Sequence, residues 1–426
     1  MKKVFVLVDF LSKISYKILM INGIILSNIT LSNCVNRIKE SPTLAITAKA
    51  AKLKSEGKDI IALAAGEPDF DTPDFIKEAA IQAIKDGLTK YTPVSGLPSL
   101  KKAVVKKFKR DNNLDYKINE VIVGVGGKQC IFNLFLALLN PGDEVIIPAP
   151  YWVSYTDIVE LTGASPMLIK CGIAQSFKMT PEQLEKSITQ HTKIVVLNSP
   201  SNPTGSVYSK TELKELANIL LKYKDIYVVT DDIYEHIRLD EQPFNNIVMV
   251  EPKLKDRCII INGVSKAYSM TGWRIGFAAG PKKIIAAMGI LQSQSTSNPT
   301  SISQAAAEAA LLGDQSCITP MLDAFKERHD FVVDAFNNIE GIECIKAQGA
   351  FYSFPHAKNA IKNLYKKGRI KNNDDIAFSE YLLDSKGIAV VPGSAFGAEG
   401  YFRISFATSM DNLKEALLRI KEAVEG

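Results

Sequence analysis

Residues 121–130 read VIVGVGGKQC, an apolar run that ends in glycines and a lysine. Glycines between a strand and a helix often cradle a phosphate, because the free N–H groups at the start of the helix point at the anion. The stretch therefore predicts a strand–turn–helix unit of an α/β fold with a phosphate-binding turn. Three ligands are open at this point: a dinucleotide, a nucleotide in a P-loop, and a phosphate monoester.

The spacing of this stretch argues against the first two ligands. A dinucleotide fingerprint needs glycine at its first, third and sixth positions; Gly124 and Gly126 supply two, but Gln129 is the sixth. A P-loop needs glycine five residues before Gly127 and Ser or Thr after the lysine, where Ile122 and Gln129 stand. An apolar helix that begins just after Gly126 and Gly127 can still hold a single phosphate monoester.

Further Val/Ile-rich runs predict the rest of a sheet. They lie at 144–150, 193–198, 226–230, 258–263 and 275–280. Because these runs are continuously apolar and alternate with amphipathic helices, they indicate a mostly parallel α/β sheet that is buried on both faces. The C-terminal part, with a long helix at 316–340, short strands near 351–354 and 401–407, and a closing helix at 411–424, predicts a second, smaller α+β domain.

Composition narrows the class of protein. The chain has 426 residues, is 46% hydrophobic and 23% charged, and carries a formal net charge of +5 that is spread along its length. This pattern predicts a globular protein that binds no nucleic acid. Six cysteines without a CxxC pair and four dispersed histidines favour a reducing cytoplasm and no metal site.

The N-terminus begins like a secretory signal but does not continue like one. Asp9, Lys13 and Lys17 interrupt its apolar run, and the longest apolar segment, 18–26, is far shorter than the roughly 20 residues that span a bilayer. Three interpretations of residues 1–34 stay open: a poorly ordered extension, a weak targeting segment, or a start codon assigned too early, with the true start at or near Met20. We favour an extension without a function of its own, and we expect no membrane association.

Polar residues follow three of the predicted strands. Asn202 lies in the Pro/Gly-rich turn after 193–198, Asp231 directly follows 226–230, and Lys266 closely follows 258–263. Open parallel sheets bind ligands beyond the carboxyl ends of their strands, so these three side chains should meet in one crevice. A lysine that forms a Schiff base, a carboxylate that keeps a pyridine nitrogen protonated and a phosphate-holding loop are what pyridoxal phosphate requires.

The motifs around these residues resemble class I aminotransferases. The stretch GVSKAYSMTGWRIG (263–276) is similar to the pyridoxal-phosphate attachment signature of that family. The same family has counterparts of AGEPDFDTP (65–73), TKYTPVSG (89–96), PAPYWVSY (148–155), NSPSNPTG (198–205), TDDIYEH (230–236) and YFRISFATS (401–409). The resemblance covers about residues 35 to 424 and points to the subgroup that includes bacterial aspartate aminotransferases.

This resemblance implies a fold and a domain organisation. The fold is that of type I pyridoxal-phosphate enzymes, with a mostly parallel seven-stranded sheet. We expect a large cofactor-binding domain over 75–315, and a small domain formed by 35–74 together with 316–426.

The resemblance also implies roles around the cofactor ring. Lys266 would form the Schiff base and later move a proton between the substrate Cα and the cofactor, and it is the catalytic residue. Asp231 would pair with the pyridine nitrogen, Tyr234 and Asn202 would bond the ring oxygen, and Trp152 would stack on the ring.

Other residues would hold the cofactor phosphate. Arg274 would clamp it, and Ser265 would assist, because the hydroxyl found three residues before the lysine in many relatives is replaced by Gly263. A tyrosine such as Tyr91 reaches the neighbouring subunit's phosphate in this family, which implies a homodimer with shared sites. The helix-start loop completes the set with Gly126, Gly127 and Lys128.

The substrate contacts follow from the same resemblance. Arg403 resembles the arginine that grips the α-carboxylate, with Gly66 beside it, and Lys128 resembles the lysine that reaches a distal carboxylate. Lys39, near Thr43, matches a basic position that is associated with prephenate use. Trp152 and Asn202 would also contact the substrate.

The implied reaction is ping-pong transamination from L-aspartate to 2-oxoglutarate, and the subgroup also includes prephenate aminotransferases, which form arogenate. The alternatives are another pyridoxal-phosphate enzyme of the same fold, either an aromatic aminotransferase or a C–S lyase, and a nicotinamide-dependent dehydrogenase. Aminotransferase-like effector domains of transcription regulators need a DNA-binding domain upstream, and about 35 residues are too few for one.

Overall fold

The computed structural model describes residues 19–21, 24–26 and 30–426. The chain falls into two units, residues 1–39 and 40–426. The first unit contains an antiparallel pair, β1 (Leu19–Ile21) and β2 (Ile24–Leu26), and a short helix, α2 (Asn33–Asn36). The predicted extension over 1–34 lies largely outside the described residues. No helix in the described ranges has the length and hydrophobicity that a membrane crossing requires.

A seven-stranded sheet organises the second unit, in the order β4-β10-β9-β8-β7-β5-β6. Strand β10 runs antiparallel to both of its neighbours, and the other pairs are parallel. The predicted mostly parallel seven-stranded α/β sheet is therefore confirmed. Its strands are β4 (Val121–Val125), β5 (Glu144–Ala149), β6 (Ser165–Lys170), β7 (Thr192–Asn198), β8 (Tyr227–Asp231), β9 (Cys258–Gly263) and β10 (Ile275–Ala279).

Both faces of this sheet are buried, as the continuous apolar runs predict. Val121 and Val123 of β4 pack in one core cluster, whereas Ile122, between them in sequence, packs in a second cluster on the other face. Burial of each such side chain contributes about 1.5–3 kcal/mol to folding. The sheet is thus a rigid platform for the residues at its strand ends.

Strand β6 has no counterpart among the predicted runs. It forms the edge of the sheet and pairs only with β5, so its side chains are mostly exposed or half-buried. A half-exposed edge strand does not need the continuous apolar run that marks the central strands.

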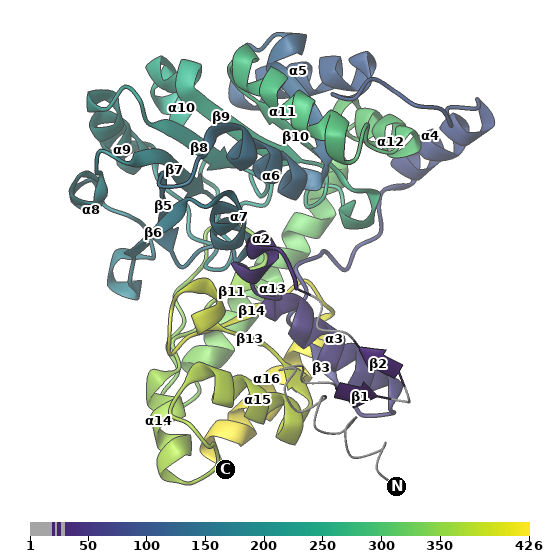
Figure 1. Ribbon diagram of the computed structural model, residues 1–426. Helices are drawn as coiled ribbons and strands as arrows, with labels where there is room; N and C mark the ends of the chain where they lie inside the picture. The colour runs from purple at the N-terminus through teal and green to yellow at the C-terminus, as the bar shows by residue number, and fades with distance from the viewer. Residues whose placement is uncertain (1–18, 22–23, 27–29) are drawn as a thin grey trace, which may run out of the picture. The chain divides into compact units, whose positions relative to one another are not determined.

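Helices cover the sheet, and several begin and end where local signals place them (Figure 1). Helix α4, for example, begins directly after Pro73 and ends before Gly87, which has a φ of 72°. The helices of this unit are α3 (Pro42–Ser55), α4 (Asp74–Lys85), α5 (Pro98–Asn112), α6 (Gly126–Leu138), α7 (Ser154–Thr162), α8 (Pro181–Ser187), α9 (Lys210–Lys222), α10 (Ile247–Val250), α11 (Lys282–Ser295), α12 (Ser301–Leu312), α13 (Thr319–Asn337), α14 (Lys358–Lys366), α15 (Asp375–Lys386) and α16 (Met410–Glu425).

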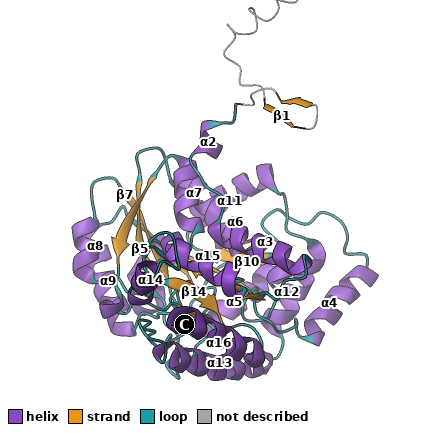
Figure 2. Cartoon of the chain, turned by 90° about the horizontal axis from the view of Figure 1, so that it is seen from below, coloured by secondary structure: helices purple, strands orange, loops and turns teal. Residues whose placement is uncertain are grey.

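The C-terminal elements form a second layer of structure. A three-stranded sheet joins β11 (Tyr352–Ser353), β14 (Phe402–Ser405) and β13 (Val391–Pro392). Helix α13 packs against β11, and α13 and α16 lie side by side (Figure 2). Strand β3 (Ile61–Ala62) pairs with β12 (Ile388–Ala389), so the segment that follows α3 is tied to this region. The predicted boundaries of 75–315 for a large domain and of 35–74 with 316–426 for a small one stay predictions.

Candidate active site

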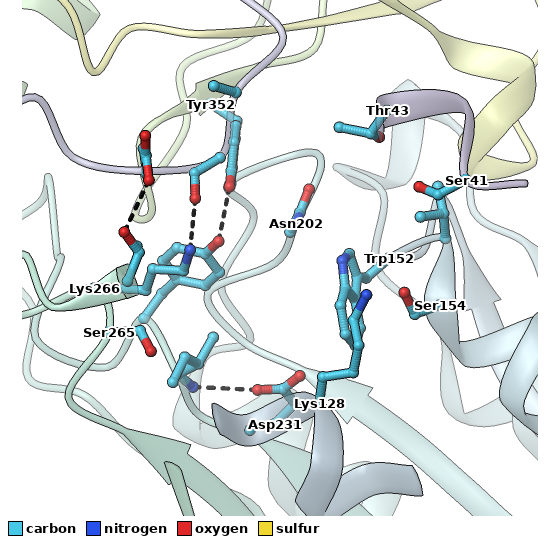
Figure 3. Close-up of a pocket in the computed structure, with 18 of the residues that line it drawn as sticks. Ser41, Thr43, Lys128, Trp152, Ser154, Asn202, Asp231, Ser265, Lys266 and Tyr352 are labelled. Carbon is cyan, nitrogen blue, oxygen red and sulfur yellow. Dashed lines mark hydrogen bonds between the residues drawn. The ribbon is translucent and has the colours of Figure 1, made fainter. Parts of the chain in front are cut away.

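One cavity of about 460 Å³ collects most of the predicted site residues (Figure 3). It lies beyond the carboxyl ends of β7, β8 and β9, where an open α/β sheet binds its ligand. The predicted residues that line it are Thr43, Gly66, Gly127, Lys128, Trp152, Asn202, Asp231, Tyr234, Ser265, Lys266, Arg274 and Arg403.

The ends of adjacent parallel strands bring the central polar groups together. Asn198 ends β7 and Asp231 ends β8, and the side-chain amide of Asn198 donates to the carbonyl of Asp231 at 2.9 Å. The Asn198 side-chain oxygen accepts from the backbone N–H of Asn202 at 2.8 Å. Asn198, which sequence analysis did not single out, thereby holds the turn that carries Asn202.

Lys266 lies in the cavity with its amine donating to the Gly66 carbonyl at 2.5 Å. The pKa of this amine is lowered to about 8: burial is the largest cause, Arg403 and Arg274 act in the same direction, and Glu67 and Asp231 oppose them. An amine with such a pKa is partly unprotonated near neutral pH, which suits it to attack a carbonyl and to carry a proton.

Asp231 is a buried carboxyl group, 6% exposed, that faces the cavity. The Tyr155 hydroxyl donates to it at 2.6 Å and the Ile233 N–H at 3.3 Å. Burial raises the pKa of Asp231 to about 6, whereas these two donors and Lys266 lower it. A carboxylate in this setting stabilises a protonated ring nitrogen of a ligand, because it otherwise lacks a full countercharge.

Tyr155 reaches this carboxylate from α7, and the sequence did not identify it. Its ring also packs edge-on against Trp152, with 5.2 Å between the ring centroids. The motif PAPYWVSY contains both residues, but only the fold shows that Tyr155 turns towards Asp231.

Arg403 presents a fixed guanidinium group to the cavity. It is 2% exposed, and it donates to the Asn202 side-chain oxygen at 2.8 Å and to the Ala64 carbonyl at 2.6 Å. The guanidinium lies over the Tyr352 ring, 4.5 Å from its centroid, and the buried Nε has no hydrogen-bond partner among the residues that the structure describes. A buried cation held in this way can bind a carboxylate with directional hydrogen bonds.

Tyr352 is a third residue that the sequence left unassigned. Its hydroxyl lies 2.8 Å from the hydroxyl of Tyr234, and both rings line the cavity (Figure 3). A Cβ at Gly66 would lie 2.6 Å from the Tyr352 hydroxyl oxygen, so the glycine allows this tyrosine to approach.

The start of α6 forms a cradle for a phosphate group. Gly126 has a φ of 78°, and a Cβ there would lie 2.6 Å from Nη2 of Arg274. A Cβ on Gly276, in the neighbouring strand, would lie 2.2 Å from the backbone nitrogen of Gly127. Backbone N–H groups at the helix start, the Arg274 guanidinium and the Ser265 hydroxyl are the donors that a phosphate monoester needs.

Lys128 follows these glycines on the opposite side of the cavity from Lys266 (Figure 3). Its amine lies 5.0 Å from the centroid of the Trp152 ring. Burial lowers the pKa of Lys128, and the positive charge of Arg274 lowers it further. A bound anion would therefore stabilise the protonated form of this lysine.

Three predicted residues are not in the lining of the cavity. Gly126 lies just behind it, against Arg274. Tyr91 is 90% exposed, on a loop outside the cavity. Lys39 belongs to the first unit of the chain, so its assignment to substrate binding stays a prediction. The assignment of Tyr91 to the cofactor phosphate of a neighbouring subunit also stays a prediction.

A buried ionic cluster lies away from this cavity. The possible metal ligands Asp111, Glu235 and His236 have atoms within 4.8 Å of one another. The Lys107 ammonium, itself 1% exposed, forms an ion pair with Glu235 and a hydrogen bond of 2.8 Å to the Asn112 side chain. The lysine thus supplies the positive charge that these carboxylates need.

Comparisons with known proteins agree with this geometry. A family model described as aminotransferase class I and II matches residues 58–420. The aspartate/prephenate aminotransferase of Nitrosomonas europaea is 59% identical over 92% of this chain and 98% of that protein, and that of Cereibacter sphaeroides is 50% identical over 93% and 99%. A solved aspartate aminotransferase from Rhizobium meliloti is 47% identical, with a TM-score of 0.88 over 93% of this chain and 99% of that one. The Thermus thermophilus aspartate aminotransferase with maleate is 41% identical, with a TM-score of 0.87 over 93% and 100%.

Proposed function

The chain belongs to the class I and II aminotransferases, and on that premise we propose that it is a pyridoxal-phosphate-dependent aspartate aminotransferase. It would transfer the amino group of L-aspartate to 2-oxoglutarate and form oxaloacetate and L-glutamate. The observation that carries this proposal is one cavity that holds the Lys266 amine, the Asp231 carboxyl, a phosphate cradle at α6 and the Arg403 guanidinium.

The residues present fit pyridoxal phosphate. The glycines at the start of α6, Ser265 and Arg274 would hold its phosphate, and Asp231 would hold its ring nitrogen in the protonated form. When bound, this cofactor supplies an electron-accepting ring that stabilises negative charge on the substrate carbon.

The side chains of the cavity would then divide the work of transamination. Arg403 binds the α-carboxylate of the amino acid and orients it, since Asn202 and Ala64 fix the guanidinium plane. The Lys266 amine would take the proton from the substrate Cα and deliver it to the cofactor carbon that is bonded to the substrate nitrogen. Tyr234, held by Tyr352, donates to the oxygen on the cofactor ring.

Lys128 supports a dicarboxylic substrate. Its amine lies in the cavity over Trp152, where the distal carboxylate of aspartate or 2-oxoglutarate would restore an ordinary pKa to this lysine. The Thermus thermophilus relative was solved with maleate, which is itself a dicarboxylate.

Prephenate is a second acceptor that specific observations favour. The relatives from Nitrosomonas europaea and Cereibacter sphaeroides are both named aspartate/prephenate aminotransferases. Thr43 lines the cavity, and Lys39 precedes it by four residues. We therefore propose that the enzyme also transaminates prephenate to L-arogenate.

We further propose a cytoplasmic homodimer. Tyr91 is 90% exposed in the single chain, which fits a side chain that completes the site of a second subunit. Light scattering would then report twice the 46.7 kDa of the chain.

A visible spectrum and a substrate panel test the proposal. The purified protein should show the absorption band of lysine-bound pyridoxal phosphate, and Lys266→Ala should abolish it. A colourless protein that binds a nicotinamide nucleotide would support the dehydrogenase alternative instead. Comparison of kcat/KM for aspartate, glutamate and aromatic donors with each acceptor separates the aspartate enzyme from an aromatic aminotransferase or a lyase, and equal values for alanine and aspartate would refute the dicarboxylate assignment.

A further inference from the structure

Two segments that are distant in sequence are joined at the rim of the cavity. Residues 66–72 follow β3, and residues 265–274 form the loop that carries Lys266. Their hydrogen bonds run from Lys266 to the Gly66 carbonyl at 2.5 Å, from Thr271 to the Glu67 carboxylate at 2.8 Å, from Trp273 to the Thr72 hydroxyl at 3.0 Å and from Thr72 to the Ser269 carbonyl at 2.7 Å. The first segment is thus held directly against the loop of the catalytic lysine.

Glu67 is the charged side chain among these hydrogen-bonded groups to which the proposed function gives no role. Among the described residues that line the cavity, Glu67 and Asp231 are the acidic ones. Asp231 is engaged by Tyr155 and by a backbone N–H on the far side of the cavity. The Glu67 carboxylate accepts a hydrogen bond from Thr271, and Glu67 directly follows Gly66, whose carbonyl accepts from the Lys266 amine.

The charged groups that act on the Lys266 amine come from four parts of the fold. They are Glu67, Asp231, Arg274 and Arg403, and the ring of Tyr234 lies 5.9 Å away. Burial lowers the pKa of Lys266, and the two arginines act in the same direction. The largest charge effect is that of Glu67, which opposes burial and exceeds the effect of Asp231.

We propose that Glu67 is a positioning residue for transamination: its carboxylate, anchored by Thr271, stabilises the ammonium of Lys266 on the Gly66 carbonyl after the amine has accepted the substrate proton. In that step the Cα–H bond breaks and an N–H bond forms on Lys266, while the electron pair stays with the carbon. Glu67 acts only through Lys266, and the inference rests on the proposed function. It adds a countercharge to the lysine that the cofactor and substrate contacts do not supply.

Glu67→Gln tests this role because it removes the charge and keeps the shape of the side chain. Asp69→Asn is the matched control, since Asp69 lies in the same segment and pairs with Arg328 at 2.7 Å instead of acting on Lys266. The cofactor-free full-length protein is treated with an acetyl N-hydroxysuccinimide ester between pH 6 and pH 10. Mass spectrometry then measures acetylation of the peptide that contains Lys266.

We expect Glu67→Gln to increase the acetylation rate of Lys266 at pH 7 by about two- to fivefold, as loss of one countercharge on an exposed carboxylate implies. The rates of variant and wild type should converge near pH 10, where the amine is unprotonated in both. In the cofactor-loaded protein, the pH midpoint of the visible band should move to lower pH. Asp69→Asn should leave both measurements unchanged.

Two outcomes would overturn the inference. One is a Glu67→Gln profile that coincides with wild type, which would mean that the carboxylate does not act on the lysine. The other is an equal change in Asp69→Asn, which would assign the effect to loosening of the segment. A wild-type protein that forms no visible band with pyridoxal phosphate would instead refute the proposed function, so the two failures are distinguishable.

Discussion

Replacement of Arg403 by lysine tests the carboxylate-binding part of the site. The guanidinium donates to Asn202 and to the Ala64 carbonyl, and the Arg403 side chain lines the cavity. A lysine keeps the positive charge, but it lacks the planar guanidinium that can donate to the protein and to a substrate carboxylate at the same time. Arg403→Lys should therefore weaken substrate binding in the transition state without removing the cofactor.

The size of the loss follows from the hydrogen bonds. One hydrogen bond to a charged group contributes about 1.5–3 kcal/mol, and each 1.36 kcal/mol is about a tenfold factor. We expect kcat/KM to fall by about 10- to 150-fold. The loss should be similar for aspartate and for an aromatic donor, because both amino acids carry the α-carboxylate.

Single-turnover measurements with each donor would check this prediction, with the visible band used to verify cofactor loading. Arg419→Lys serves as control, because Arg419 forms ion pairs with Asp59 and Glu415 at the surface and should tolerate the change. A loss below about threefold for both donors, at full cofactor loading, would show that Arg403 is not the carboxylate-binding group.

Three further predictions address other parts of the structure. Lys128→Ala should raise KM for aspartate about tenfold or more and change KM for an aromatic donor less than about threefold. Equal losses for both donors in steady-state assays would mean that Lys128 binds the cofactor phosphate instead of the distal carboxylate. Tyr155→Phe removes a hydrogen bond that lowers the pKa of Asp231, so the pH profile of kcat/KM should lose activity on its acid side at higher pH than wild type, by about one unit. An unchanged acid limb would contradict that role. Lys107→Met should destabilise the fold by about 3–5 kcal/mol in urea unfolding, since it leaves the buried Glu235 carboxylate without its partner, and a loss below about 1 kcal/mol would contradict the buried ion pair.

The contribution of Lys266 to the free energy of unfolding depends on pH, and the direction of this dependence follows from its pKa. The pKa of this amine in the folded chain is about 8, below its ordinary value of 10.5. The unprotonated amine therefore favours the folded state, and this contribution is present above pH 10.5 and is lost as the pH falls through about 8. In the cofactor-free protein, Lys266→Met should remove this part of the pH dependence in thermal unfolding, and an identical profile would contradict it.

Much of the site could be predicted because its groups directly follow buried strands. The runs that end at Asn198, Asp231 and Gly263 are apolar enough to be recognised, and parallel strands necessarily bring their carboxyl ends to one edge. The residues that were missed come from other elements. Tyr352 meets Tyr234 from a position 118 residues away, and no local pattern marks such a partner.

The sequence by itself determined the α/β class, the turn at Gly126 and Gly127, and the lysine and carboxylate of the site, because strand periodicity and helix-start chemistry are local properties. Only the tertiary structure decided what surrounds these groups. Tyr155 on Asp231 and Glu67 beside Lys266 depend on contacts between distant segments, and burial in the folded cavity shifts the pKa values of the carboxyl and the amine towards each other. Desolvation arises only when the chain packs. The reacting groups can therefore be identified from the sequence, but the shifts of their pKa values cannot.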